Sequence, residues 1–155
     1  MSEKTIQVGH KTVVAMVHIP ALPGSPDYDI ASGMTKIIGS VIADLEALQS
    51  GGVDAVMFGN EFDRPYELKA PPEGLAAIAS VIGQVKSIIK IPFGVNYLWD
   101  PVATVALAVA TEASFAREIF TGVYASDMGL WAPDCAGAAR LRASLGRSDL
   151  QMLFN

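Results

Sequence analysis

Polar side chains that can do chemistry stand where short apolar runs of this sequence end. Imidazole and carboxylate groups transfer protons, whereas amide and guanidinium groups hold oxygen-rich ligands. The candidate catalytic residues are His18, Glu61 and Glu118. The candidate ligand-binding residues are Asn60, Asn96, Arg117, Tyr124, Asp127 and Asn155. These residue types predict either a proton-transfer pair or an oxygen-rich shell for a divalent metal ion.

Each candidate also has a purely structural interpretation. His18 directly precedes a loop rich in proline and glycine, so its imidazole can bind a ligand or metal, or can hold the loop by a hydrogen bond. Asp63 is better explained as shaping a turn or pairing with Arg64. Asn96 shares a strand face with Gly94, which either leaves room for a ligand or lets the amide bind a neighbouring strand.

Arg117 and Glu118 are adjacent charged residues inside a run that otherwise reads as a buried strand. Side chains alternate along a strand, so only one of the two can point into a barrel while the other faces the helices. Burying either charge without a partner would cost several kcal/mol. We therefore expect each of them to have a partner.

A long loop is expected at residues 121–133, and loops of this length are more often functional than passive. It contains Tyr124 and Asp127, and we interpret it as a candidate lid. Trp131 can instead anchor the helix that follows, with Asp134 as its N-terminal cap.

Strands and helices alternate along the whole chain. Short β-rich runs predict strands, and apolar residues at helical spacing predict the helices between them. The expected strands are residues 12–18, 53–58, 91–95, 115–120 and 150–154. The expected helices are residues 34–48, 75–85, 101–110 and 134–145. This order predicts an α/β fold with one parallel sheet and right-handed connections.

Two architectures fit that order. A doubly wound open sheet would be complete at this length, whereas a TIM barrel has eight strands and about 250 residues. The polar residues at the strand ends favour the barrel, because its strands converge on one mouth. A nucleotide-binding open sheet is not supported, because the loop after His18 lacks the expected series of glycines.

Composition indicates one domain, with residues 1–11 as a tail and residues 12–155 as the barrel domain. The chain has 155 residues, of which 51% are hydrophobic and 17% are charged, and its net charge is −5. Scattered basic residues argue against nucleic-acid binding, and no apolar run is long enough to span a membrane. The polar N-terminus lacks a secretory signal and Cys135 is the only cysteine, so we expect a cytoplasmic protein.

Four strings resemble successive motifs of the BtpA/SgcQ family. They are VHIPALPGSP at residues 17–26, GGVDA at 51–55, PFGVN at 92–96 and TGVYASDMG at 121–129. The resemblance implies a TIM barrel of the phosphate-binding kind, of which this chain resembles the first five strands. It departs from many relatives after the second strand, at residues 59–63, and in the fourth, at Arg117 and Glu118; both departures look closer to the SgcQ branch.

The resemblance implies two alternative functions. The SgcQ branch is associated with sugar utilisation, which implies an enzyme or binder of a small sugar-type ligand, with or without a phosphate. The BtpA branch implies a non-catalytic assembly factor of photosystem I biogenesis. A phosphate site of the usual TIM type would follow strands seven and eight, which this chain does not contain.

Five strands of a barrel would expose two sheet edges and part of the barrel interior. We therefore expect a homo-oligomer, completion by another chain, or a longer gene product of which this sequence is a part.

Overall fold

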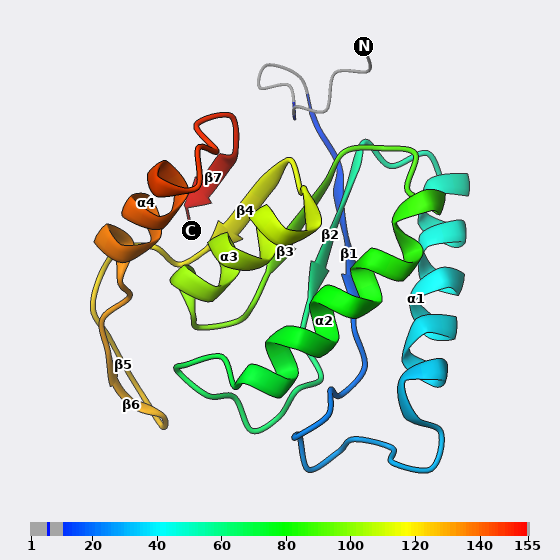
Figure 1. The fold of residues 1–155 in the computed structure, drawn as a ribbon, viewed down its shortest axis with the longest axis horizontal. Coiled ribbons are helices and arrows are strands. Elements are labelled where there is room, and N and C mark those ends of the chain that lie inside the picture. Colours follow the sequence, from blue (N-terminus) through cyan, green and yellow to red (C-terminus); the bar gives the residue numbers. More distant parts are fainter. Residues whose placement is uncertain (1–5, 7–10, 155) are drawn as a thin grey trace.

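The computed structural model describes residue 6 and residues 11–154, and Figure 1 shows how the strands and helices follow one another. The strands of the main sheet are β1 (Val14–His18), β2 (Ala55–Gly59), β3 (Phe93–Asn96), β4 (Phe115–Glu118) and β7 (Gln151–Phe154). The helices are α1 (Gly33–Ser50), α2 (Pro72–Val85), α3 (Pro101–Thr111) and α4 (Cys135–Ser144), with a 3-10 turn η1 (Lys86–Ile88). A hairpin of β5 (Tyr124–Ser126) and β6 (Gly129–Trp131) precedes α4.

The order of the strands decides between the two architectures. The five strands lie in the order β1-β2-β3-β4-β7, and every neighbouring pair is parallel. A doubly wound sheet would reverse its order at a switch point and place helices on both faces. Here the order never reverses, and Figure 1 shows α1, α2 and α3 on the same face of the sheet. The sheet is therefore of the β/α-barrel type, as the motifs predicted.

The two faces of the sheet are covered very differently. The helix-facing side carries the main core, in which Val17, Phe58 and Val95 pack against residues of the helices such as Val81. The opposite side carries a small cluster of Ala55, Met57 and Phe115, with Met16 and Leu153 packed on it. In a β/α barrel the second face points inward, so this cluster corresponds to a layer of barrel interior.

Local signals in the sequence start and end the helices as predicted. The Asp100 carboxylate accepts hydrogen bonds from the amides of Val102 and Ala103, and Pro101 occupies the first helical turn of α3. Asp134 caps α4 in the same way. Gly52 has φ 77°, the left-handed conformation in which a helix commonly ends, just after α1.

The main departure from the predicted elements is the segment at residues 121–133. The prediction was a loop, but the structure forms the antiparallel hairpin β5–β6 there, with Tyr124 paired to Trp131. The reason is turn geometry: Gly129 has φ 96°, which ends the tight connection and starts β6. β4 is also shorter than expected and ends at Glu118, because Phe120 leaves the strand and packs against Phe154.

Within residues 11–154, the structure contains no helix that is both long and apolar enough to cross a membrane. The expected tail at residues 1–11 lies mostly outside the described residues, and so does Asn155.

Candidate functional site

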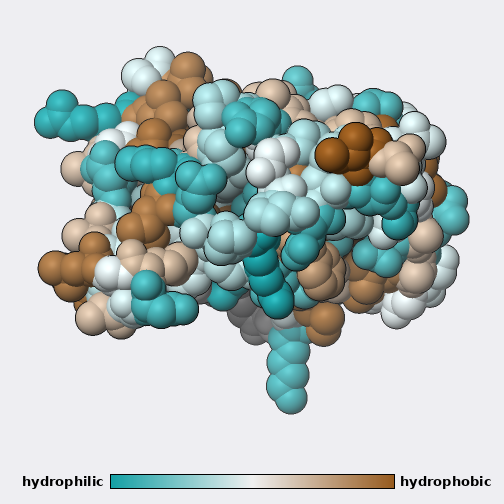
Figure 2. All heavy atoms as spheres, turned by 90° about the horizontal axis from the view of Figure 1, so that it is seen from below, coloured by the Kyte–Doolittle hydropathy of each residue, from teal (hydrophilic) through white to brown (hydrophobic). Residues whose placement is uncertain are grey.

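The carboxyl ends of the strands bring four of the predicted residues to one edge. Strand register places His18 beside Gly59, and Gly59 beside Asn96. The Asn96 side chain then reaches Arg117 and Glu118 at the end of β4. Figure 2 looks at the molecule from below, towards this edge, and shows mostly hydrophilic residues across its centre. We call it the carboxyl edge.

Asn96 and Glu118 form a buried polar pair between β3 and β4. The Asn96 Nδ2 donates to Glu118 Oε2 at 2.6 Å and to the carbonyl of Arg117 at 2.7 Å. Asn96 is 3% exposed and Glu118 is 2% exposed. Asn96 is therefore satisfied by the neighbouring strand, which is the structural interpretation considered above.

Burial makes the Glu118 carboxyl unusual. It raises the pKa of Glu118 to about 7, although hydrogen bonds from the amides of Ile119 and Trp99 and from Asn96 act in the opposite direction. The Ile119 amide donates to Oε1 at 2.8 Å. Near neutral pH the protonated and the ionised form of this carboxyl are therefore both accessible, which suits a group that both gives and takes a proton.

Strand alternation assigns Arg117 and Glu118 to opposite faces of β4. Arg117 shares its face with Phe115, whose ring belongs to the cluster on the inner side. Glu118 shares its face with Ala116, which belongs to the core beneath the helices. Alternation therefore assigns the Glu118 position to the helix side and Arg117 to the barrel-interior side. The Glu118 carboxylate nevertheless contacts the side chain of Asn96, which shares with Gly94 the face of β3 that Phe115 covers.

His18 and Glu61 each contact an aromatic residue. The His18 imidazole packs edge-on against Phe62, with ring centroids 6.0 Å apart. Glu61 receives hydrogen bonds from the Tyr66 hydroxyl, at 2.7 Å to its carbonyl and 3.4 Å to Oε1. His18 ends β1 and Glu61 lies in the loop after β2, and both are at the carboxyl edge.

Asn60 and Asp63 hold neighbouring loops in place. The Leu98 amide donates to Asn60 Oδ1 at 2.8 Å, and Asn60 is 3% exposed. Asp63 accepts from the amide of Leu22 at 3.2 Å and from the hydroxyl of Tyr97 at 3.3 Å. Asp63 thus shapes the loops, as its structural interpretation predicted, but its partners are Leu22 and Tyr97 rather than Arg64.

Four aromatic rings form a cluster that the sequence did not reveal. Trp99 packs against Trp131 at 5.2 Å and Tyr66 at 6.2 Å between centroids, and Tyr124 packs against Trp131 at 5.7 Å. Trp99 has φ 71°, and its buried Nε1 has no hydrogen-bond acceptor among the described residues. The only sequence signal was that Trp99 shortly follows Asn96, the end of an expected strand.

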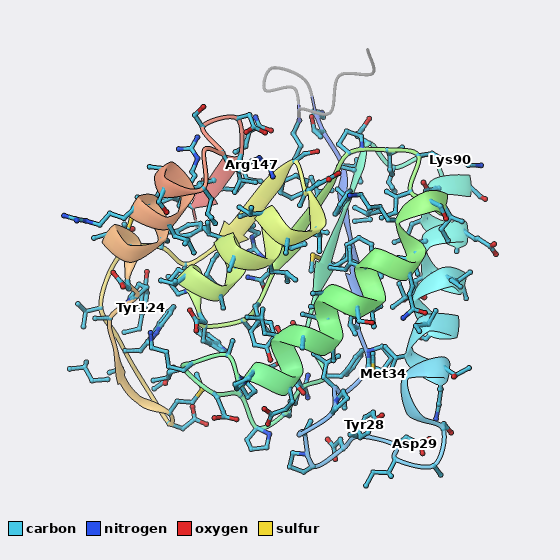
Figure 3. The ribbon with its side chains drawn as sticks, viewed as in Figure 1. Tyr28, Asp29, Met34, Lys90, Tyr124 and Arg147 are labelled. Atoms are coloured by element: carbon cyan, nitrogen blue, oxygen red, sulfur yellow. The ribbon has the colours of Figure 1, made fainter. Side chains whose placement is uncertain are left out.

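The predicted lid residues are on the hairpin. Tyr124 is exposed and its hydroxyl donates to the Thr121 carbonyl at 3.0 Å; Figure 3 labels it at the hairpin segment. Asp127 is exposed in the turn between β5 and β6. In the described part of the chain, the structure joins neither side chain to His18, Asn96 or Glu118 by a hydrogen bond or ring contact.

Two ideas from the sequence need correction. The space above Gly94 is not open for a ligand, because a Cβ there would overlap with the ring of Phe115. The oxygen-rich metal shell is also not assembled: across residues 11–154, no three side chains of His, Cys, Asp or Glu come together as metal ligands.

A cavity of about 300 Å³ lies beside this edge, between the loop after β1 and the loop after β2. Pro23, Tyr66 and Tyr97 contribute to its wall. Among the described residues, Asn60 is the one predicted site residue that lines it.

The fold and the carboxyl-edge polar residues define a parallel β/α protein of the barrel type. Its shape is similar to that of dihydropteroate synthase from Vibrio fischeri, with a TM-score of 0.66 at 14% identity over 97% of this chain and 47% of that one. A second dihydropteroate synthase, from Xanthomonas albilineans, has a TM-score of 0.59 at 16% identity and covers 90% of this chain and 44% of that one. At these identities the likeness concerns the fold alone.

The chain belongs to the BtpA family, whose model matches residues 9–155. It is 54% identical over 145 residues to the sgc region protein SgcQ of Escherichia coli, covering 94% of this chain and 54% of that protein. It is 30% identical over 147 residues to the photosystem I biogenesis protein BtpA of Synechocystis, covering 93% of this chain and 50% of that protein. The chain thus spans about half the length of these relatives.

Proposed function

We propose that this protein is an enzyme or binder that acts on a small sugar-type ligand, with or without a phosphate, at the carboxyl edge. The observation that carries the proposal is the buried pair of Asn96 and Glu118. A carboxyl whose pKa lies at about 7 can serve as general acid and general base at neutral pH. The greater identity to SgcQ than to BtpA supports the sugar-utilisation branch.

The other candidates then have distinct roles. Glu118 moves the proton, and His18 and Glu61 bind ligand hydroxyls or assist in proton transfer. Arg117, on the inner face, supplies the positive charge that a phosphate would need. We propose that the protein does this in the cytoplasm.

Contact between a ligand and Glu118 requires movement, because the side chain is only 2% exposed. Trp99 is the residue placed to move: its amide binds Glu118, and its backbone has φ 71°. A non-glycine residue in that conformation is strained and is often found at functional sites. Ligand binding should therefore change the fluorescence of the tryptophans.

The test is a panel of hexoses, pentoses and their phosphates, measured by thermal shift and by titration calorimetry. We expect one class to bind, and Glu118→Gln and His18→Asn each to weaken that binding at least tenfold. Glu46→Gln, on the exposed face of α1, is the control and should bind as the parent does. The proposal fails if no member binds, or if both site variants bind as tightly as the control.

A second candidate function is a non-catalytic assembly factor. It is favoured by the identity to BtpA and by exposed apolar side chains on the hairpin, where Val123 is 66% exposed and Leu130 is 76% exposed. Val123→Ser and Leu130→Ser would then abolish function in cells, whereas Glu118→Gln would not.

We also propose that the edges of the sheet are covered in the working protein. β1 and β7 are the edge strands of the described sheet, and open parallel edges invite pairing. Either a further segment of polypeptide or a second copy would cover them. If this 155-residue chain is a monomer by light scattering and also unfolds cooperatively, that result would contradict the proposal.

A further inference from the structure

The cavity beside the carboxyl edge differs from the site proposed above. Its volume of about 300 Å³ is at the lower end of the range that small-molecule sites occupy. It lies between the loop that follows β1 and the loop that follows β2. Neither Glu118 nor His18 lines it.

The walls of the cavity are held in place before any ligand arrives. Asp63 joins the two loops to the residue that follows β3, since it accepts hydrogen bonds from the Leu22 amide and from the Tyr97 hydroxyl. The Ser25 hydroxyl adds a second link, since it donates to the carbonyl of Arg64 at 3.2 Å. The lining includes four prolines, whose φ angles are fixed: Pro23, Pro26, Pro65 and Pro71. A ligand would therefore meet a preformed site with little loop ordering to offset.

The charge of the lining selects the class of ligand. Two carboxylates, Asp63 and Glu67, line the cavity, and its described lining includes no lysine or arginine. A third carboxylate is close, because a Cβ on Gly24 would lie 2.9 Å from the Cγ of Glu73. A phosphate would be repelled here, whereas a positive charge would be attracted.

Aromatic walls strengthen the same preference. Tyr66 and Tyr97 both line the cavity. An ammonium group gains from contact with aromatic rings, and aromatic walls are a common way to recognise choline-like groups. The proline side chains add apolar surface for the methyl or methylene groups of such a ligand.

We propose that this cavity binds a small organic cation, a primary or quaternary ammonium compound about the size of choline. The proposal does not rest on the sugar-type function, since no residue with a catalytic role there lines the cavity. The two therefore succeed or fail separately.

The experiment is a titration of the isotope-labelled protein with choline, followed by NMR. We expect saturable shifts centred on the amides of Gly24 and Glu67. The neutral compound 3,3-dimethylbutan-1-ol has the same shape as choline without the charge, and it should bind at least tenfold more weakly. Inorganic phosphate should cause no shift at these amides.

Variants of the lining locate the site. Glu67→Gln removes an exposed carboxylate and should weaken choline binding at least threefold. Tyr66→Leu removes an aromatic ring and should weaken choline binding further. Tyr66→Phe keeps the ring and should bind choline nearly as the parent does. Glu46→Gln removes the same charge far from the cavity and should leave binding unchanged. If Tyr66→Leu does not fold, Glu67→Gln alone decides. Equal binding of choline and its neutral analogue, or unchanged binding by Glu67→Gln, overturns the proposal.

Discussion

The Asn96 Nδ2 lies 2.6 Å from Glu118 Oε2, and this contact joins the ends of β3 and β4 within the protein. The Nδ2 atom of the Asn96 side chain can only donate a hydrogen bond, so the contact stabilises the ionised form of the Glu118 carboxyl. Burial has the larger effect and raises the pKa of Glu118 to about 7. The pair therefore combines a costly buried acid with a partner that limits the cost.

This relationship predicts how stability depends on pH. Because the folded-state pKa of Glu118 lies above its ordinary value of 4.5, the folded state binds more protons between about pH 4.5 and 7. The contribution of Glu118 to stability is then fully present below pH 4.5 and is lost as pH rises through 7. A shift of this size corresponds to at most about 3 kcal/mol. Urea unfolding from pH 4.5 to 8 should show this fall.

Glu118→Gln should remove most of that pH dependence, because glutamine does not titrate. Glu46→Gln, an exposed change of the same kind, should retain it. Parallel stability curves for the parent and Glu118→Gln over this range would show that Glu118 does not have a raised pKa.

Asn96→Ala should destabilise the protein by about 1–3 kcal/mol, since it removes the donor to Glu118 and to the Arg117 carbonyl. The loss should be larger at pH 8 than at pH 5, because the bond to an ionised carboxylate is the stronger one. In the background of Glu118→Gln this difference between the two pH values should disappear. A loss that is the same at both pH values in the parent would contradict the role given to the pair.

Gly94→Ala should be strongly destabilising, because the added Cβ overlaps with the Phe115 ring. Overpacking of this kind typically costs about 1–3 kcal/mol. Phe115→Leu should restore part of the stability in the double variant. Gly39→Ala in α1 is the matched control: nothing lies within 4 Å of its added Cβ, so thermal unfolding should show a gain of about 0.5–1 kcal/mol.

Asp63→Ala should loosen the two loops that form the cavity. It leaves the buried amide of Leu22 and the hydroxyl of Tyr97 without their acceptor, at a cost of about 1–3 kcal/mol. Hydrogen exchange at Leu22 should become faster, and choline binding should weaken. Asp44→Ala, at an exposed position of α1, should change neither property.

Local features of the sequence were enough for most of the fold. Apolar runs and helical spacing located the parallel strands and the four helices, and Asp100 and Asp134 marked two helix starts correctly. These features depend on neighbours along the chain, so they can be predicted without knowing the packing. The hairpin β5–β6 was not predicted, because its strands are only three residues each and depend on contacts of Tyr124 and Trp131.

The sequence by itself determined that polar residues end the strands, and that Arg117 and Glu118 occupy alternating positions of β4. Only the tertiary structure decided which face of the sheet the helices cover, and that the Glu118 carboxylate binds Asn96. It also decided that Phe115 fills the space over Gly94 and that Asp63 binds Leu22. These contacts join residues far apart in the chain, and the spacing of residues along one strand carries no information about its neighbour's side chains.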